Sequence, residues 1–213
     1  MNKFLDIFKT SIGKKLIMAL SGWGFILFLT IHLCGNLTFY GGRDFFNAYV
    51  DSLHQFELLI TVSEFILLTL AHLHILTGVL LFIKNLQARP KRYVSNKWGG
   101  GRTIASAIMP YTGMFIFIFL FFHLLDFHYA DKTYQTVYHI VTQTFENPLY
   151  TVFYLFSMAV VALHVSHGFW SLFQTLGVNH YKYMPFIRFM GIFISIIFGI
   201  GFGSLPLYIA LSL

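Results

Sequence analysis

The chain has 213 residues, of which 57% are hydrophobic, 19% aromatic and 10% charged, and its mean hydropathy is +0.70. So little polar surface excludes a water-soluble globular protein of this length and predicts an integral membrane protein. The formal net charge is +6, and the single cysteine, Cys34, excludes a disulfide within the chain.

Five apolar stretches follow one another along the chain. Each is long enough to cross a hydrocarbon core of about 30 Å as a helix that rises about 1.5 Å per residue. The first follows a lysine-bearing amphipathic lead and lacks the cleavage site of a signal peptide, so we expect it to be retained. We predict a single all-α membrane domain of five transmembrane helices at 16–40, 58–85, 104–127, 149–176 and 186–211, joined by short loops at 41–57, 86–103, 128–148 and 177–185.

Basic residues determine the predicted orientation, because loops rich in Lys and Arg favour the cytoplasm. An N-terminus inside the cell places 12 of the 14 Lys and Arg residues on the cytoplasmic side and leaves Arg43 and Lys132 outside. We therefore predict a multi-pass protein of the bacterial cytoplasmic membrane, with its N-terminus inside and its C-terminus outside. The basic face, which includes Arg89, Lys91 and Arg92, has two interpretations: topology with anionic lipid, or a docking surface for a soluble partner.

Four histidines lie inside apolar stretches, one in each of the first four: His32, His74, His123 and His164. An imidazole within the bilayer is costly unless it hydrogen-bonds or binds a ligand. Counted from the cytoplasmic helix ends, His32 and His123 lie about 24 and 29 Å up, and the other two about 17 and 18 Å up. These two levels predict two haems in the bundle core, with His74 and His164 as axial ligands of an inner haem and His32 and His123 of an outer one.

Two further histidines, His72 and His167, compete for the inner positions because they also lie in apolar surroundings. Each preferred inner ligand is followed four residues later by a glycine, Gly78 or Gly168, which leaves room for a flat macrocycle on the same helix face. This spacing favours the chosen pair. His72 then becomes a hydrogen-bond partner of a threonine or a backbone carbonyl, and His167 a partner of a haem propionate. The sequence has no C-x-x-C-H motif, so both haems are expected to be b-type.

Several longer stretches resemble a known family. HLCGNLTFYGGRDFFNAYVDSL, HILTGVLLFIKNLQARPKRY, HLLDF and LHVSHGFWSLFQTLGVNHYKY are similar to the single-chain dihaem cytochrome b subunit of succinate:quinone oxidoreductases, which include fumarate reductases and succinate dehydrogenases. The similarity extends over all five predicted helices, and the family's axial ligands map onto the same four histidines. One position departs from the pattern: some dihaem fumarate reductases have a glutamate two residues before the fourth-helix ligand, where this chain has Ala162, so a proton route through that residue is in doubt.

The resemblance implies a function and partners. The chain would anchor a flavoprotein subunit and an iron–sulfur subunit on the cytoplasmic face, and it would exchange electrons between menaquinone or menaquinol and these subunits. Fumarate or succinate would react on the partner subunits and not on this chain.

Quinol oxidation releases protons together with electrons, so a quinol site needs a proton acceptor. Glu57, at the outer start of the second helix, is the first candidate, since its Phe-Glu-Leu context looks like that of the acidic quinol-site residue in related subunits. Glu64 is the second, because it lies seven residues further on, on nearly the same face, and an acid within a span needs a reason to be there. An interfacial charge at Glu57 and a structural hydrogen bond at Glu64 are the alternative interpretations.

Two other functions fit parts of this pattern. The cytochrome b subunits of membrane hydrogenases, formate dehydrogenases and nitrate reductases also use histidines on several helices, but the ARP and HGFWSLFQTLG contexts disfavour them. A proton-coupled transporter would use intramembrane histidines as a relay. The sequence shows no inverted repeat and no pair of broken helices, which disfavours a transporter.

Overall fold

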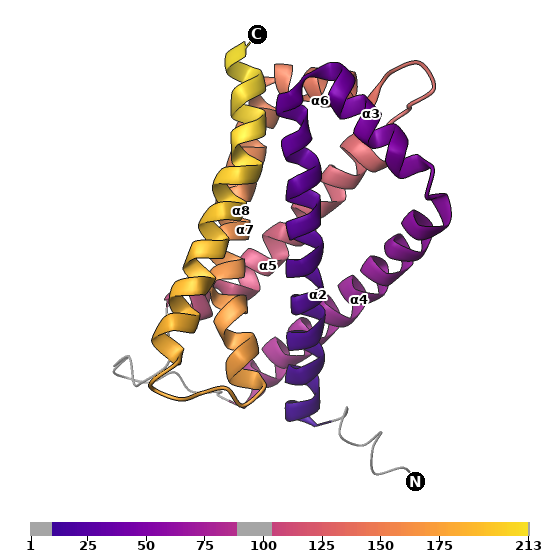
Figure 1. The fold of residues 1–213 in the computed structure, drawn as a ribbon. Helices are drawn as coiled ribbons and strands as arrows, with labels where there is room; N and C mark the ends of the chain where they lie inside the picture. Colours follow the sequence, from indigo (N-terminus) through magenta and orange to yellow (C-terminus); the bar gives the residue numbers. More distant parts are fainter. Residues whose placement is uncertain (1–9, 89–103, 213) are drawn as a thin grey trace.

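The computed structural model describes residues 10–88 and 104–212. Five long apolar helices dominate this part of the chain, and each is long enough to span a membrane. The five predicted long apolar helices are therefore confirmed as candidate membrane spans, with boundaries that differ from the prediction by a few residues. The helices are α2 (Ser11–Leu37), α4 (Glu57–Gln87), α5 (Ile104–His123), α7 (Pro148–Thr175) and α8 (Met184–Ser212) (Figure 1).

Two of the predicted loops were wrong, because each contains a short helix. A 3-10 turn, η1 (Thr38–Gly41), and α3 (Arg43–His54) connect α2 to α4; a π-helical segment, η2 (Leu124–His128), and α6 (Val137–Glu146) connect α5 to α7. Both helices bury one side: Phe46 of α3 and Phe145 of α6 are in the core, and Phe39 stacks on Tyr138 at 4.4 Å between ring centres. Figure 1 shows α3 and α6 side by side at the end where α8 terminates.

Specific residues determine where these helices begin and end. Gly42, between η1 and α3, has φ of 86°, and Gly177, just after α7, has φ of 88°, a backbone conformation that glycine adopts without steric cost. At the start of α7 the Asn147 side chain accepts a hydrogen bond from Leu149 N at 3.0 Å, and Pro148 occupies the first helical position. These are common signals for the start and the end of a helix.

Small residues bring α8 close to its neighbours. A Cβ atom added to Gly199 would lie 3.1 Å from the Cβ of Ala162 on α7, and one added to Gly201 would lie 2.8 Å from Leu33 on α2. Because backbones approach closely at such contacts, α8 packs along α7 and α2. The Ala162 side chain therefore packs against Gly199 of α8.

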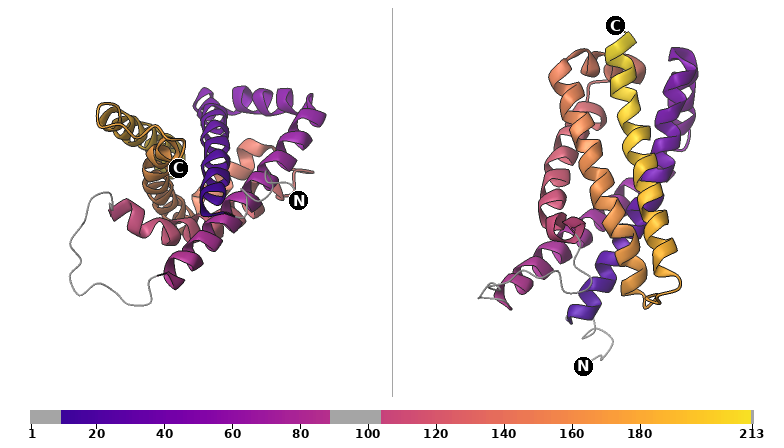
Figure 2. Two further views of the ribbon diagram at one scale, coloured as in Figure 1. Left: turned by 90° about the horizontal axis from the view of Figure 1, so that it is seen from below. Right: turned by 90° about the vertical axis from the view of Figure 1, so that its left-hand side faces the viewer.

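Helix α4 is inclined to the other long helices and lies at the edge of the bundle (Figures 1 and 2). Of its residues, Thr77 and Leu81 are buried, and large apolar side chains such as Leu58, Phe65 and Leu76 are exposed. An apolar surface of this extent fits a lipid-facing helix, since it would cost a large free energy in water.

Candidate functional site

The four predicted histidines form two pairs across the bundle, as their depths in the sequence predicted. His32 on α2 faces His123 on α5, with ring centres 5.9 Å apart and an interplanar angle of 84°. His74 on α4 faces His164 on α7, with ring centres 6.3 Å apart and an interplanar angle of 64°. Each pair therefore joins two helices that are distant in sequence.

The separation within each pair fits one metal ion between the two rings. An imidazole nitrogen lies about 2 Å from a metal that it binds, and the ring centre about 1 Å further, so two opposed ligands have centres about 6 Å apart. Among the described residues no three His, Cys, Asp or Glu side chains gather at one point. Each pair thus offers two protein ligands, which is the number that a haem with bis-histidine ligation takes from the protein.

Hydroxyl groups on neighbouring helices contact the inner pair. The Nδ1 atom of His74 lies 3.1 Å from Ser21 Oγ and 3.2 Å from the carbonyl oxygen of Met18, both on α2. The Nδ1 atom of His164 lies 3.0 Å from Thr112 Oγ1 on α5. Because a carbonyl oxygen can only accept, the His74 contact favours a proton on Nδ1, which leaves Nε2 free to bind a metal.

The outer pair has a different environment. His123 Nδ1 is buried and has no hydrogen-bond partner among the described residues, and such an orphaned polar atom is costly unless something absent from the polypeptide satisfies it. His32 stacks on Phe28 at 5.2 Å between ring centres. Asn36 donates to the carbonyl oxygen of His32 at 2.8 Å, whereas its distance of 3.5 Å to His32 Nε2 is too long to compete.

Two glycines that the sequence analysis did not single out, Gly22 and Gly113, lie beside the inner pair. A Cβ atom added to Gly22 would lie 3.3 Å from His74 Cε1, and one added to Gly113 would lie 3.4 Å from His164 Cε1. Of the two predicted glycines, Gly168 has no atom within 4 Å of an added Cβ, and Gly78 has only the flexible end of a methionine. The space beside Gly168 fits the predicted room for a macrocycle.

The two competing histidines lie outside the pairs. His72 is exposed on α4, and its Nδ1 lies 2.8 Å from the carbonyl oxygen of Leu68, in agreement with the predicted backbone partner. His167 is half-buried beside Trp170 at 4.6 Å between ring centres. Its Nδ1 is buried and has no partner among the described residues, so His167 is available to an anionic group, as its predicted role as a propionate partner requires.

The two candidate proton acceptors lie at the α3 and α6 end of α4. Glu57 is the first residue of α4 and is exposed. Glu64 lies two turns further, and its Oε1 is 3.8 Å from His128 Nδ1 at the end of the α5 span. The side chains of Glu64 and His128 are 51% and 43% exposed, so this carboxylate–imidazole pair is accessible from outside the bundle.

Sequence reasoning missed an acid near the outer pair. Asp126, in the π-helical segment η2, accepts a hydrogen bond of 2.8 Å from the hydroxyl of Tyr154. Tyr154 is 4% exposed, and its ring centre is 6.1 Å from that of His123. The segment HLLDF carried the signal: Asp126 follows His123 by three residues within an apolar run, and an intramembrane carboxylate commonly marks a functional site.

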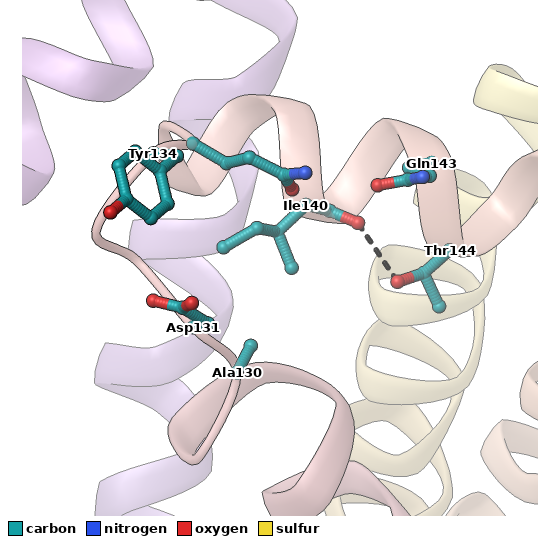
Figure 3. Close-up of a pocket in the computed structure, with 7 residues that line it drawn as sticks. Ala130, Asp131, Tyr134, Ile140, Gln143 and Thr144 are labelled. Atoms are coloured by element: carbon teal, nitrogen blue, oxygen red, sulfur yellow. Dashed lines mark hydrogen bonds between the residues drawn. The ribbon is translucent and has the colours of Figure 1, made fainter.

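Two polar cavities lie next to each other beside α6. The first, of about 340 Å³, is drawn in Figure 3 and is lined by Ala130, Asp131, Tyr134, Gln135, Ile140, Gln143 and Thr144. The second, of about 220 Å³, shares two of these residues and reaches the acid described above; it is lined by Asp126, Gln143, Thr144, Asn147 and Tyr150. Polar side chains thus extend from the partly buried carboxyl group of Asp126 to the surface at the α6 end.

The basic cluster Arg89, Lys91 and Arg92 lies outside the described residues. Among the described residues, the Arg188 guanidinium lies over the Trp170 ring at 4.9 Å from its centre. No family model, no curated protein and no solved structure matches this chain.

Proposed function

We propose that this chain is the dihaem cytochrome b anchor of a quinol:fumarate reductase or succinate dehydrogenase. The observation that carries the proposal is the presence of two opposed histidine pairs, at 5.9 and 6.3 Å between ring centres, at two depths of one helix bundle. Two b haems bound there would supply one-electron transfer across the membrane.

The chain's own residues would hold these groups in an apolar setting. His74 and His164 would bind the inner haem and His32 and His123 the outer one, each through a ring nitrogen. The open space at Gly168 and the unpartnered Nδ1 of His167 support a bulky anionic ligand next to the inner pair. Aromatic rings such as Phe28 and Phe119 pack on the outer pair and keep water away from it.

Protons from a membrane quinol, proposed here as menaquinol, would be accepted at the α3 and α6 end. Glu64 is the better supported acceptor, because it faces an imidazole that can take part in a proton transfer and both groups are half-exposed. Glu57 lies closer to the end of the span and is the second candidate. Release of protons outside with electrons moving inward would add to the membrane potential, since Ala162 offers no compensating carboxylate.

The partners would be a flavoprotein subunit and an iron–sulfur subunit on the cytoplasmic face. Arg89, Lys91 and Arg92 would contribute to their docking. Neutralising all three should reduce co-purification of the soluble subunits at low ionic strength, and the difference from the natural chain should shrink at high ionic strength, because salt screens the same charges in the natural chain. Unchanged co-purification with unchanged orientation would leave topology as the sole role of the cluster.

The experiment that tests the function is purification of the tagged chain from its native membrane, followed by identification of the bound subunits. We expect a flavoprotein and an iron–sulfur protein, together with fumarate reduction or succinate oxidation coupled to a quinone. A bound hydrogenase, formate dehydrogenase or nitrate reductase subunit would assign the chain to the second class of cytochrome b. A haem-free chain that moves protons with a solute would identify a transporter.

A further inference from the structure

A repeated pattern of polar and small residues relates two parts of the chain. A hydroxyl residue, a glycine and a histidine recur at the same spacing in α2 and α5, and a histidine and a glycine recur at the same spacing in α4 and α7. The equivalent positions lie 90 or 91 residues apart: Ser21 and Thr112, Gly22 and Gly113, His32 and His123, His74 and His164, and Gly78 and Gly168.

The helices repeat in the same order as the residues. One unit contains the long helix α2, the short helix α3 and the returning helix α4, and the second contains α5, α6 and α7 (Figure 1). Each histidine pair takes one member from each unit, and α8 lies outside both. A residue type that recurs at equivalent places in two units is expected to have the same role in both.

Ser21 and Thr112 have equivalent surroundings in the two units. Ser21 is 2% exposed, and its hydroxyl donates to the carbonyl oxygen of Ile17 at 2.8 Å on its own helix. Thr112 is 8% exposed, and the carbonyl oxygen of Met109 lies 3.1 Å from its hydroxyl. Each hydroxyl proton therefore has a backbone acceptor, which leaves the oxygen lone pairs free to accept a hydrogen bond.

We propose that Ser21 and Thr112 are positioning residues for the inner histidine pair. Each hydroxyl accepts the Nδ1 hydrogen of one inner histidine, at 3.1 Å for His74 and 3.0 Å for His164. The bond holds the ring in one orientation and one tautomer, so that Nε2 is unprotonated and can bind a metal. This inference rests on the proposed haem ligation, since it assigns the group that orients each ligand.

The two bonds differ in one respect that makes the proposal testable. His74 Nδ1 has a second acceptor, the carbonyl oxygen of Met18 at 3.2 Å. His164 Nδ1 has one hydrogen-bond partner among the described residues, the hydroxyl of Thr112. Loss of the Thr112 hydroxyl should therefore affect the inner site more than loss of the Ser21 hydroxyl.

The first experiment uses Thr112→Val and Ser21→Ala in the full chain, with Thr112→Ser as the conservative rescue. Ser157→Ala is the matched control, because Ser157 is fully buried and donates to the Phe153 carbonyl at 2.7 Å without contacting a histidine. A lost second-sphere partner weakens metal binding by about 10- to 100-fold. We expect Thr112→Val to weaken inner-haem retention within that range and Ser21→Ala to weaken it less.

The second readout is the midpoint potential of each haem in a redox titration. An oxygen that accepts the Nδ1 hydrogen makes the imidazole a stronger donor and favours the oxidised metal, so Thr112→Val should raise the inner midpoint potential. Thr112→Ser and Ser157→Ala should leave it unchanged, and no variant should move the outer one. An unchanged inner potential and unchanged haem retention in Thr112→Val would overturn the proposal.

A third readout is independent of the cofactor. Nitrogen-15 NMR of the haem-free full chain in lipid nanodiscs, with labelled histidine, reports which ring nitrogen of His164 carries the proton. We expect the proton on Nδ1 in the natural chain and a mixture of tautomers in Thr112→Val. A proton on Nε2 in the natural chain would refute the positioning role, whereas absence of haem from the natural chain would refute the proposed function and leave this measurement valid.

Discussion

The partly buried hydrogen bond between Tyr154 and Asp126 should contribute measurably to the stability of the bundle. Tyr154→Phe removes the hydroxyl that donates to the Asp126 carboxyl group at 2.8 Å. A hydrogen bond to a charged group contributes about 1.5–3 kcal/mol. The 220 Å³ polar cavity beside Asp126 gives water access to the carboxyl group, so we expect a loss near the lower end, about 1.5 kcal/mol.

A double-mutant cycle isolates this interaction from other effects of each substitution. The free energy of unfolding in mixed micelles with increasing SDS would be measured for Tyr154→Phe, Asp126→Leu and the double variant. We expect the double variant to be less destabilised than the sum of the single variants by about 1.5 kcal/mol. Tyr40→Phe is the control, because its hydroxyl donates to Ser204 at 2.7 Å on an exposed side chain. Additivity within about 0.5 kcal/mol would refute the reasoning.

The remaining predictions concern the cofactor and quinol sites. Gly168→Leu should lower the content of the inner haem and leave the outer one, because the side chain fills open space beside the inner pair; two retained haems per chain would contradict this. His72→Ala should retain both haems by pyridine haemochrome assay, since His72 lies on the exposed face of α4, and loss of one would make it a ligand. Glu64→Gln should abolish quinol-linked turnover while fumarate reduction from an artificial donor persists. Full quinol-linked turnover in Glu64→Gln together with its loss in Glu57→Gln would make Glu57 the proton acceptor.

The five spans could be predicted from sequence because hydrophobic length is a strong signal. The short helices α3 and α6 could not, because ten to twelve residues with polar and apolar positions mixed are also compatible with a loop. Their helical structure depends on tertiary contacts such as the stacking of Phe39 on Tyr138.

The histidine pairs were predictable from depth, since the rise per residue fixes height along a helix. The hydroxyl partners of His74 and His164 were not, because Ser and Thr within membrane helices commonly bond only to their own backbone. Ser21 and Ser157 look equivalent in sequence, and only the packing of α2 against α4 distinguishes them. Asp126 was overlooked because its position near a span end made it resemble an interfacial charge.

The central claim is that each histidine pair binds one haem. The measurement that tests it most directly is the haem content of the purified chain by pyridine haemochrome assay, in the natural chain and in His164→Ala and His123→Ala. We expect two b haems per chain with split low-spin bands in the reduced spectrum, and about one haem in each variant. A haem-free natural chain, or two haems in both variants, would contradict it.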